Sequence, residues 1–224
     1  MRKQWKVAAT LGNRLDLRLE ARFEWCKDRF AHQVILVTAA TEHLCLQSLE
    51  GNDQEDFPPS PPLQDMSVEQ RVGSQVALGV GMAGSAMWSL SVEAPAGEGG
   101  LHFDWACQTR GAQIWPRNCY SLSGDDRGAN STPAEVVLYR WNGSDGVLGE
   151  VVLALVKTPA TLPLGYRIAN QDADALTNTR VAVNDSTGGS VLEVEGQPAD
   201  REPMDSKSGT LRWQYRIAFR MEVE

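Results

Sequence analysis

Long apolar runs are missing from this sequence. The longest candidate, residues 147–156, is interrupted by Gly149 and Glu150 and falls well short of the roughly 20 apolar residues that a transmembrane helix needs. The first ten residues are basic at their start but contain no apolar stretch of the length found in a signal peptide. From these two absences we expect a cytoplasmic protein with no membrane-spanning segment.

Cysteine and histidine are also scarce, with four and three among 224 residues. No two cysteines form a C-x-x-C pair, so their spacing argues against a zinc site. Cys45 and Cys107 fall within apolar strand patterns, and we expect them to be small core residues, although an exported protein would leave room for one disulfide. His102 and Asp104 share one strand face, but no G-x-S-x-G motif supplies a nucleophile, and we interpret them as part of a solvated face. The sequence therefore names no catalytic residue.

Basic residues are outnumbered by acidic ones. The chain has 21 Lys and Arg against 29 Asp and Glu, which gives a net charge of −8 at pH 7. An acidic chain is repelled by phosphate backbones, so we expect no nucleic-acid partner. Arg212, Arg216 and Arg220 do share a strand face, but we interpret them as the solvated side of that strand.

What the sequence does contain is a regular alternation of apolar and polar residues. It is clearest in 15–25 and 211–223, where nearly every second residue is apolar. A period of two places one set of side chains on the buried face of a sheet. Similar segments follow between Gly- and Asp-rich turns, without a convincing helix. The pattern predicts one all-β domain over 1–224, a mostly antiparallel β-sandwich of roughly ten to twelve strands, with jelly-roll connections as one option.

Proline is concentrated in a single place. Residues 50–66 begin with several acidic side chains and continue as FPPSPPLQ over 57–64. Four prolines in five residues cannot join a central strand, because proline lacks the backbone N–H that a ladder needs. We expect 50–66 to be an exposed, polyproline-like connection within the single domain.

One glycine motif matches a known fingerprint. Gly79, Gly81 and Gly84 fit G-x-G-x-x-G after an apolar strand, which is the dinucleotide-binding pattern. That mechanism needs a helix to open at the third glycine. Residues 85–93 alternate as a strand instead, so we interpret the glycines as a bulge or as a close approach of two backbones.

Tryptophan is unusually frequent, with seven residues. Those in the apolar register of their strands are expected in the core, namely Trp25, Trp88, Trp105 and Trp213. Trp115 and Trp141 stand at strand ends beside loops, where exposed rings stack on sugars or anchor a protein interface, although they would also serve to cover the core. With Asn142 and Asp145 they form our candidate ligand-binding set.

Acidic, glycine-rich loops provide a second candidate site. Calcium takes hard oxygen ligands from such loops. The candidate calcium ligands are Asp125, Asp126, Asp172 and Asp174. No stretch matches an EF-hand, and Asp and Asn are common in turns for conformational reasons alone. We predict no other cofactor.

Five short stretches in the first 120 residues form a distinctive set: residues 28–32 (DRFAH), 48–51 (SLEG), 57–64 (FPPSPPLQ), 81–93 (GMAGSAMWSLSVE) and 103–107 (FDWAC). In these stretches the chain resembles an uncharacterised family of bacterial proteins of planctomycete type. The resemblance implies a bacterial cytoplasmic protein with the Pro-rich segment inside a single domain. It implies no activity, ligand or catalytic residue.

Three classes of function follow from these observations. The lack of a nucleophile motif, a metal-ligand cluster and a supported phosphate loop favours a non-enzymatic binding or assembly protein with a protein partner. The alternative is a carbohydrate-binding, lectin-like module, and the second alternative is a hydrolase built on a β-sandwich. The long terminal strands also suit homo-oligomers that pair through strand edges.

Overall fold

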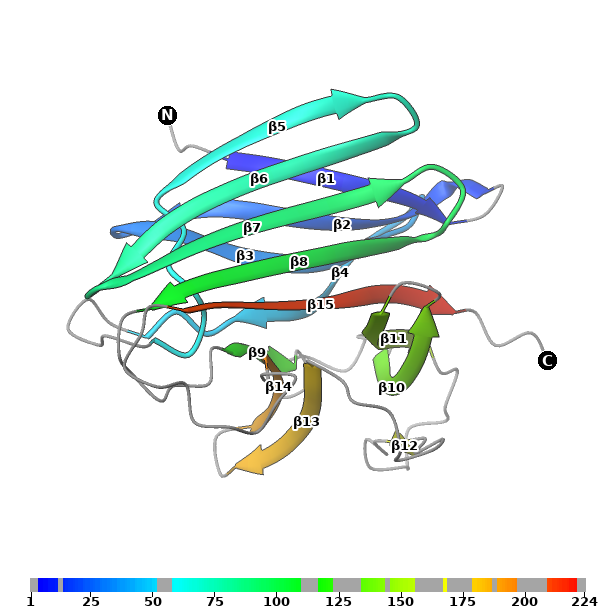
Figure 1. Ribbon diagram of the computed structural model, residues 1–224. Coiled ribbons are helices and arrows are strands. Elements are labelled where there is room, and N and C mark those ends of the chain that lie inside the picture. The colour runs from blue at the N-terminus through cyan, green and yellow to red at the C-terminus, as the bar shows by residue number, and fades with distance from the viewer. Residues whose placement is uncertain are drawn as a thin grey trace.

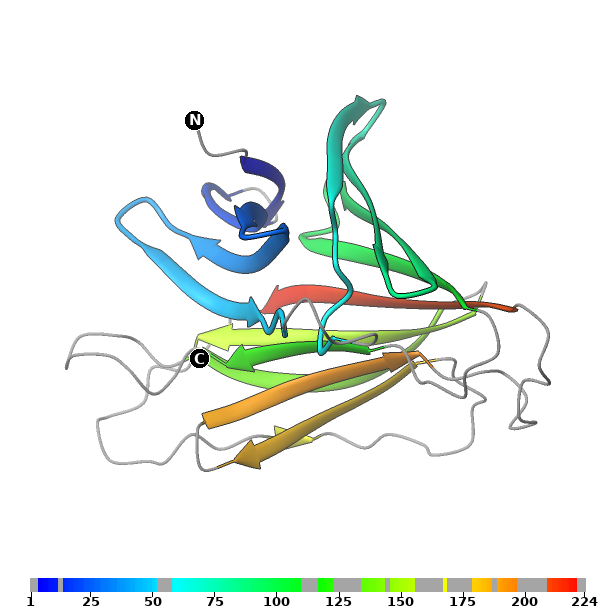
Figure 2. The ribbon, with the colours of Figure 1, turned by 90° about the vertical axis from the view of Figure 1, so that its left-hand side faces the viewer.

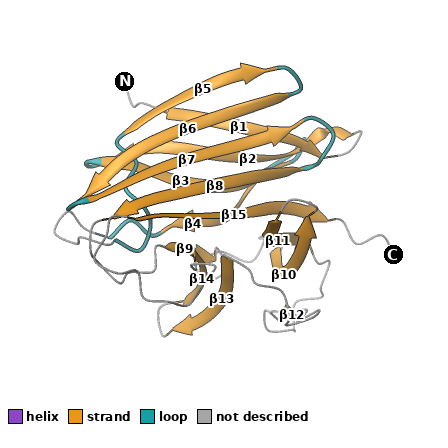
Figure 3. Ribbon diagram, in the orientation of Figure 1, coloured by secondary structure: helices purple, strands orange, loops and turns teal. Residues whose placement is uncertain are grey.

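The computed structural model describes residues 4–11, 14–51, 58–109, 117–122, 134–143, 146–155, 167–168, 179–186, 189–196 and 209–220. These residues form fifteen strands and no helix (Figures 1 and 3). Within them, no helix exists that is long and apolar enough to cross a membrane. The predicted all-β class is confirmed.

The first sheet has seven strands, all antiparallel to their neighbours. In spatial order these are β1 (Gln4–Leu11), β2 (Arg14–Cys26), β3 (Arg29–Val37), β4 (Glu42–Ser48), β9 (Arg117–Leu122), β14 (Gly189–Gly196) and β13 (Thr179–Ser186).

The second sheet has eight strands, and only the pairs β10–β12 and β11–β15 are parallel. In spatial order these are β12 (Arg167–Ile168), β10 (Ala134–Gly143), β11 (Gly146–Leu155), β15 (Gly209–Arg220), β8 (Gly100–Thr109), β7 (Ala86–Pro95), β6 (Ser74–Ala83) and β5 (Asp65–Arg71).

The two sheets face each other as a sandwich. Strands β1 to β4 form one layer, and β5 to β8 with β15 form the facing one (Figures 1 and 2). Strand β1 contacts all of β5 to β8 across the interior. Consecutive strands are mostly neighbours in one sheet, so the connections are meanders rather than jelly-roll crossovers. The fifteen strands exceed the predicted ten to twelve.

The alternating patterns behave as the period of two requires. In β15 the buried side chains are Leu211, Trp213, Tyr215 and Ile217, with Ala218 also buried. In β2 they are Leu17, Leu19, Ala21 and Phe23. Cys45 and Cys107 are buried as predicted, and all four cysteines are free thiols.

One expectation about the terminal strands was wrong. Trp25 was expected in the core but is 39 % exposed. It stands one residue before the end of β2 and packs edge-on against Phe30 with ring centroids 5.0 Å apart. Both long terminal strands have a neighbour on each side for part of their length, since β2 lies between β1 and β3 and β15 lies between β11 and β8. Pairing of two copies through strand edges stays a prediction.

The Pro-rich connection was expected to be exposed, and its described part is not. Residues 58–63 are buried, with Pro59 partly so. The segment passes between the sheets: the Phe30 N–H donates to the Leu63 carbonyl at 2.7 Å, and the Gln64 N–H donates to the Val80 carbonyl at 2.8 Å. Prolines carry no N–H, so burying four of them leaves few backbone donors to satisfy.

The glycines of the G-x-G-x-x-G motif make room for this connection. A Cβ on Gly81 would lie 1.8 Å from the Pro62 carbonyl oxygen, and one on Gly79 would lie 2.8 Å from the sulfur of Met66. Gly84 has a φ of 52° in the turn between β6 and β7. The prediction of a close backbone approach is therefore confirmed, and the strand that follows leaves no helix for a pyrophosphate.

Gly81→Ala should destabilise the protein by about 3 kcal/mol or more, because its Cβ would overlap a backbone oxygen that cannot move without shifting the whole connection. Gly73→Ala is the control: Gly73 has a φ of 77° and open space around it, so that variant should lose only about 1 kcal/mol. Urea unfolding measures both. Equal losses in the two variants would contradict the close approach.

Candidate functional site

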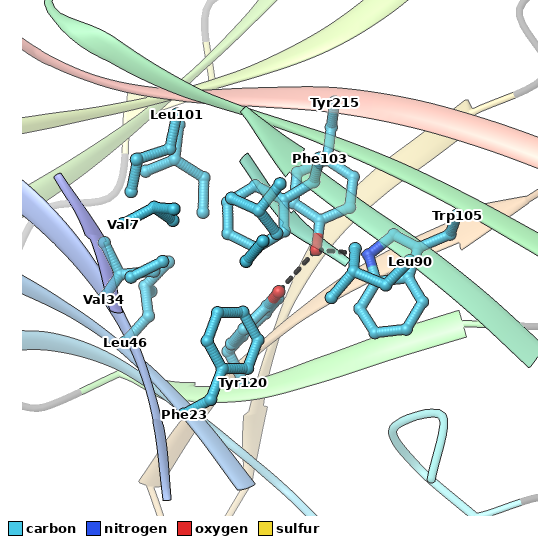
Figure 4. Close-up of a cluster of buried hydrophobic side chains, with 14 of the residues drawn as sticks. Val7, Phe23, Val34, Leu46, Leu90, Leu101, Phe103, Trp105, Tyr120 and Tyr215 are labelled. Carbon is cyan, nitrogen blue, oxygen red and sulfur yellow. Dashed lines mark hydrogen bonds between the residues drawn. The ribbon is translucent and has the colours of Figure 1, made fainter. Parts of the chain in front are cut away.

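A chain of polar side chains crosses the interior of the sandwich. The His32 Nε2 lies 2.8 Å from the Tyr120 hydroxyl, which lies 2.5 Å from the Tyr215 hydroxyl. The Trp105 indole N–H donates to Tyr215 at 3.2 Å (Figure 4). Since β3 and β9 belong to the first sheet and β8 and β15 to the second, these hydrogen bonds join the two layers. We call these four residues the inter-sheet chain.

Burial fixes the protonation states in the inter-sheet chain. Loss of solvent lowers the pKa of His32 to about 3, so its imidazole is neutral. Burial also raises the pKa of both Tyr120 and Tyr215, which keeps the hydroxyls protonated. A second link lies beside the first, where the Trp213 indole N–H donates to Asn118 Oδ1 at 3.1 Å.

Glu50 adds a carboxyl group next to the inter-sheet chain. The Ser48 hydroxyl accepts the backbone N–H of His32 at 2.8 Å and donates to Glu50 Oε1. Burial raises the pKa of Glu50 to about 7, although the Ser48 hydrogen bond and the Arg29 charge act in the opposite direction. Its second oxygen has no hydrogen-bond partner among the described residues.

Histidine, glutamate and tyrosine together are residue types that an acid–base catalyst uses. Here, however, His32 is 1 % exposed and Tyr120 is fully buried. Neither they nor Glu50 line the pocket described below. The hydrogen bonds of His32 and Tyr120 to each other and to Tyr215 give these groups a role in holding the two sheets together.

Tyr120→Phe and Tyr215→Phe should each destabilise the protein by about 1–3 kcal/mol, because each leaves a buried partner unpaired. The double variant should lose less than the sum, since the two hydroxyls that bond each other leave together. Urea unfolding of the four proteins gives the coupling. Strictly additive losses would show that the two hydroxyls do not act as one unit.

The pH dependence of stability should reveal Glu50. Its pKa is about 7 when folded and 4.5 as an exposed group, so the stability from its neutral form is complete below pH 4.5 and is lost as the pH rises through 7. Glu50→Gln stays neutral. Relative to wild type, its free energy of unfolding should rise by up to about 3 kcal/mol between pH 4 and 8.

Glu50→Gln also isolates the effect of His32. With a pKa of 6.5 unfolded and about 3 folded, His32 favours the unfolded chain as the pH falls below 6.5. The variant should lose up to about 1.4 kcal/mol per pH unit between pH 6.5 and 3. Glu24→Gln serves as the control, because Glu24 is only partly buried and its carboxylate accepts a hydrogen bond from Gln4 at 2.9 Å. A difference between Glu50→Gln and wild type that does not vary with pH would contradict the buried carboxyl.

His102 and Asp104 lie on the same face of β8, as predicted, but each side chain interacts with a different partner. Arg212 on β15 donates through Nε to Asp104 at 2.7 Å, and a second nitrogen of its guanidinium bonds the other carboxylate oxygen. His102 Nε2 lies 2.9 Å from a Glu98 oxygen. The pairs lie on the outer face of the second sheet, as expected of a solvated face.

A pocket of about 510 Å³ lies on that same outer face, over β6, β7, β8 and β15. Its apolar part is lined by Val80, Gly81, Met82, Met87, Trp88 and Ala106, and its polar rim is formed by Gln64, Asp65, Ser89, Gln108 and Thr210. We call it the β6–β7 pocket. Val80, Met82 and Met87 are 52–54 % exposed, so the apolar part is open to solvent.

The Pro-rich connection forms one wall of the β6–β7 pocket. The Gln64 side chain amide bonds the backbone of Met82 twice, donating to its carbonyl at 3.2 Å and accepting its N–H at 3.1 Å. Met82 is paired with Met87 across the hairpin, and Asp65 is paired with Val80. The connection therefore holds the rim residues Gln64 and Asp65 beside the methionine pair.

Sequence reasoning missed this pocket because β6 has its small residues inside. Gly79 and Gly81 face the connection. The larger residues that alternate with them, Val80 and Met82, therefore point outward. In a strand where glycine alternates with Val or Met, the glycines mark a face that another backbone approaches closely. The Val and Met side chains then lie on the opposite, outer face. The close approach at the glycines was identified from the sequence, but the exposure of Val80 and Met82 on the outer face was not.

The predicted ligand-binding and calcium residues are not brought together in the described part of the chain. Trp141 and Asn142 lie near the end of β10, which is described only as backbone. The remaining candidates, Trp115, Asp125, Asp126, Asp145, Asp172 and Asp174, lie outside the described residues. Where side chains are described, no three His, Cys, Asp or Glu residues gather as a metal site would require. The carbohydrate and calcium hypotheses stay predictions.

Comparison of the chain with protein-family models, curated proteins and solved structures gave no match. The resemblance to a bacterial family therefore also stays a prediction, and function has to be argued from the pocket itself.

Proposed function

We propose that this protein is a non-enzymatic binding protein whose site is the β6–β7 pocket. The observation that carries the proposal is a clustering of exposed apolar side chains. Five large hydrophobic side chains are exposed in the described part of the chain, and three of them, Val80, Met82 and Met87, line this one pocket. Exposed apolar surface that gathers in one place, with a polar rim, is typical of an interaction site.

The size and chemistry of the pocket fit a bound apolar group. Its volume of about 510 Å³ lies within the roughly 300–1,000 Å³ range of small-molecule sites. Methionine is flexible and polarisable, so a Met82–Met87 pair adapts to side chains of different shape. The rim offers amide and hydroxyl groups of Gln108 and Thr210 as hydrogen-bond partners.

The pocket favours an apolar ligand over a sugar. Sugar sites use exposed aromatic faces, but the one aromatic residue at this pocket, Trp88, is 3 % exposed. A hydrolase is supported even less, since Asp65 is the one carboxylic acid among the described residues that line the pocket, and these residues include no histidine or second acid to act with it.

Binding of a neutral apolar dye, N-phenyl-1-naphthylamine, tests this proposal by fluorescence. The double variant Met82→Thr/Met87→Thr removes the apolar floor but keeps good strand-forming residues, and it should weaken dye binding by about tenfold or more. The matched control is Val72→Thr, which removes an exposed apolar side chain at the β5–β6 turn.

Val72→Thr should bind the dye like the wild type, and urea unfolding should show all three proteins folded. Wild-type protein that does not bind the dye, or a double variant that binds it equally well, would contradict the proposed site.

A further inference from the structure

The register of the second sheet shows which charges surround the β6–β7 pocket. On its outer face, Asp65 of β5 is paired with Val80 of β6, and Glu93 of β7 is paired with Val76 further along the same strand. Asp65 itself lines the pocket. Neither Asp65 nor Glu93 has an ion-pair partner among the described residues.

The basic side chains of this face are engaged elsewhere. Arg212 is held by Asp104, and Arg71 lies 3.2 Å from Glu69. Arg216 donates to the Glu98 carbonyl at 2.6 Å. The carbonyl does not neutralise the Arg216 charge, but β8 and β7 separate the strand of Arg216 from β6 and β5. Asp65 at the pocket and Glu93 further along the sheet therefore contribute negative charge that no described basic side chain pairs with.

The apolar residues continue along β6 and give the site a direction. Leu78, Val80 and Met82 occupy successive outward positions of the strand, and Leu78 is partly exposed. At about 3.3 Å per residue, these three positions span roughly 13 Å. Asp65 is directly across from the middle one, where paired side chains are about 5 Å apart. A partner segment that lies extended along β6, with an apolar residue at Val80, would thus place the residues flanking that apolar residue near Asp65.

We propose that the occupant of the β6–β7 pocket is a cationic protein segment, in which a large apolar side chain is flanked by lysine or arginine. This inference rests on the proposed function and names its partner. The apolar side chain enters among Val80, Met82 and Met87, and the flanking cations meet Asp65 and Glu93. Charge complementarity of this kind selects the partner and speeds encounter.

Other occupants are disfavoured by the charge of the chain. Two copies of a protein with a net charge of −8 would bring the same acidic faces together. An anionic lipid surface or a nucleic acid would be repelled in the same way. A small uncharged apolar molecule would fill the pocket but would leave Asp65 and Glu93 without a role.

Fluorescence anisotropy with three labelled peptides tests the inference. The first is a nine-residue peptide with phenylalanine and leucine at its centre and two lysines on each side. The second replaces the lysines by glutamates, and the third replaces the apolar pair by serines. At 50 mM salt the lysine peptide should bind at least about tenfold more tightly than either of the others, and added salt should weaken it.

Protein variants locate the contact. Asp65→Asn/Glu93→Gln should weaken binding of the lysine peptide by about fivefold or more and should remove most of the salt dependence of that binding. The matched control is Glu24→Gln/Glu42→Gln, which removes two acidic charges from the first sheet and should bind the peptide like the wild type.

The inference and the proposed function fail in different ways. Equal affinity for the lysine and glutamate peptides, with dye binding intact, would overturn the cationic partner and keep the pocket. Self-association that Met82→Thr/Met87→Thr abolishes, seen by sedimentation, would make a second copy the occupant and would also overturn the inference. Absence of both dye and peptide binding would overturn the proposed function as well.

Discussion

The rest of the structure depends on the close approach of the Pro62 carbonyl to Gly81. Only a residue without a Cβ fits there, because that atom would lie 1.8 Å from the oxygen. The approach lets the connection pass between the sheets and bond both, at Phe30 and at Val80. It also turns the larger side chains of β6 outward and sets Gln64 and Asp65 beside them. One steric constraint thus closes this end of the sandwich and builds the pocket.

The molecule has a chain of polar groups in its interior and a cluster of apolar side chains on its surface. Inside, the inter-sheet chain from His32 to Trp105 ties the layers through hydrogen bonds whose partners are all buried. Such a network specifies how the sheets register, because a shift would leave its members unpaired. Outside, Met82 and Met87 remain half exposed.

The sequence predicts the fold better than the site. Alternation in β2 and β15 is a local signal, since each strand shows its own buried face, and the class follows from it. Three outcomes depend on distant partners and could not be predicted. Burial of the Pro-rich segment requires Gly79 and Gly81 from another strand. The exposure of Trp25 depends on how the end of β2 packs, where Trp25 contacts Phe30 of β3. The pocket depends on which face of β6 meets the connection, and period-two patterns do not tell one face from the other when both are apolar or small.

The most direct test is an NMR titration of protein labelled with ¹³C at its methionine methyl groups. The chain has six methionines, and three of them report on this region: Met82 and Met87 in the pocket and Met66 on the buried side of the same sheet. Single Met→Thr variants assign the signals. On addition of the lysine peptide, we predict that the Met82 and Met87 signals shift together and that the Met66 signal stays in place. Peptide binding that leaves Met82 and Met87 unchanged would contradict the account.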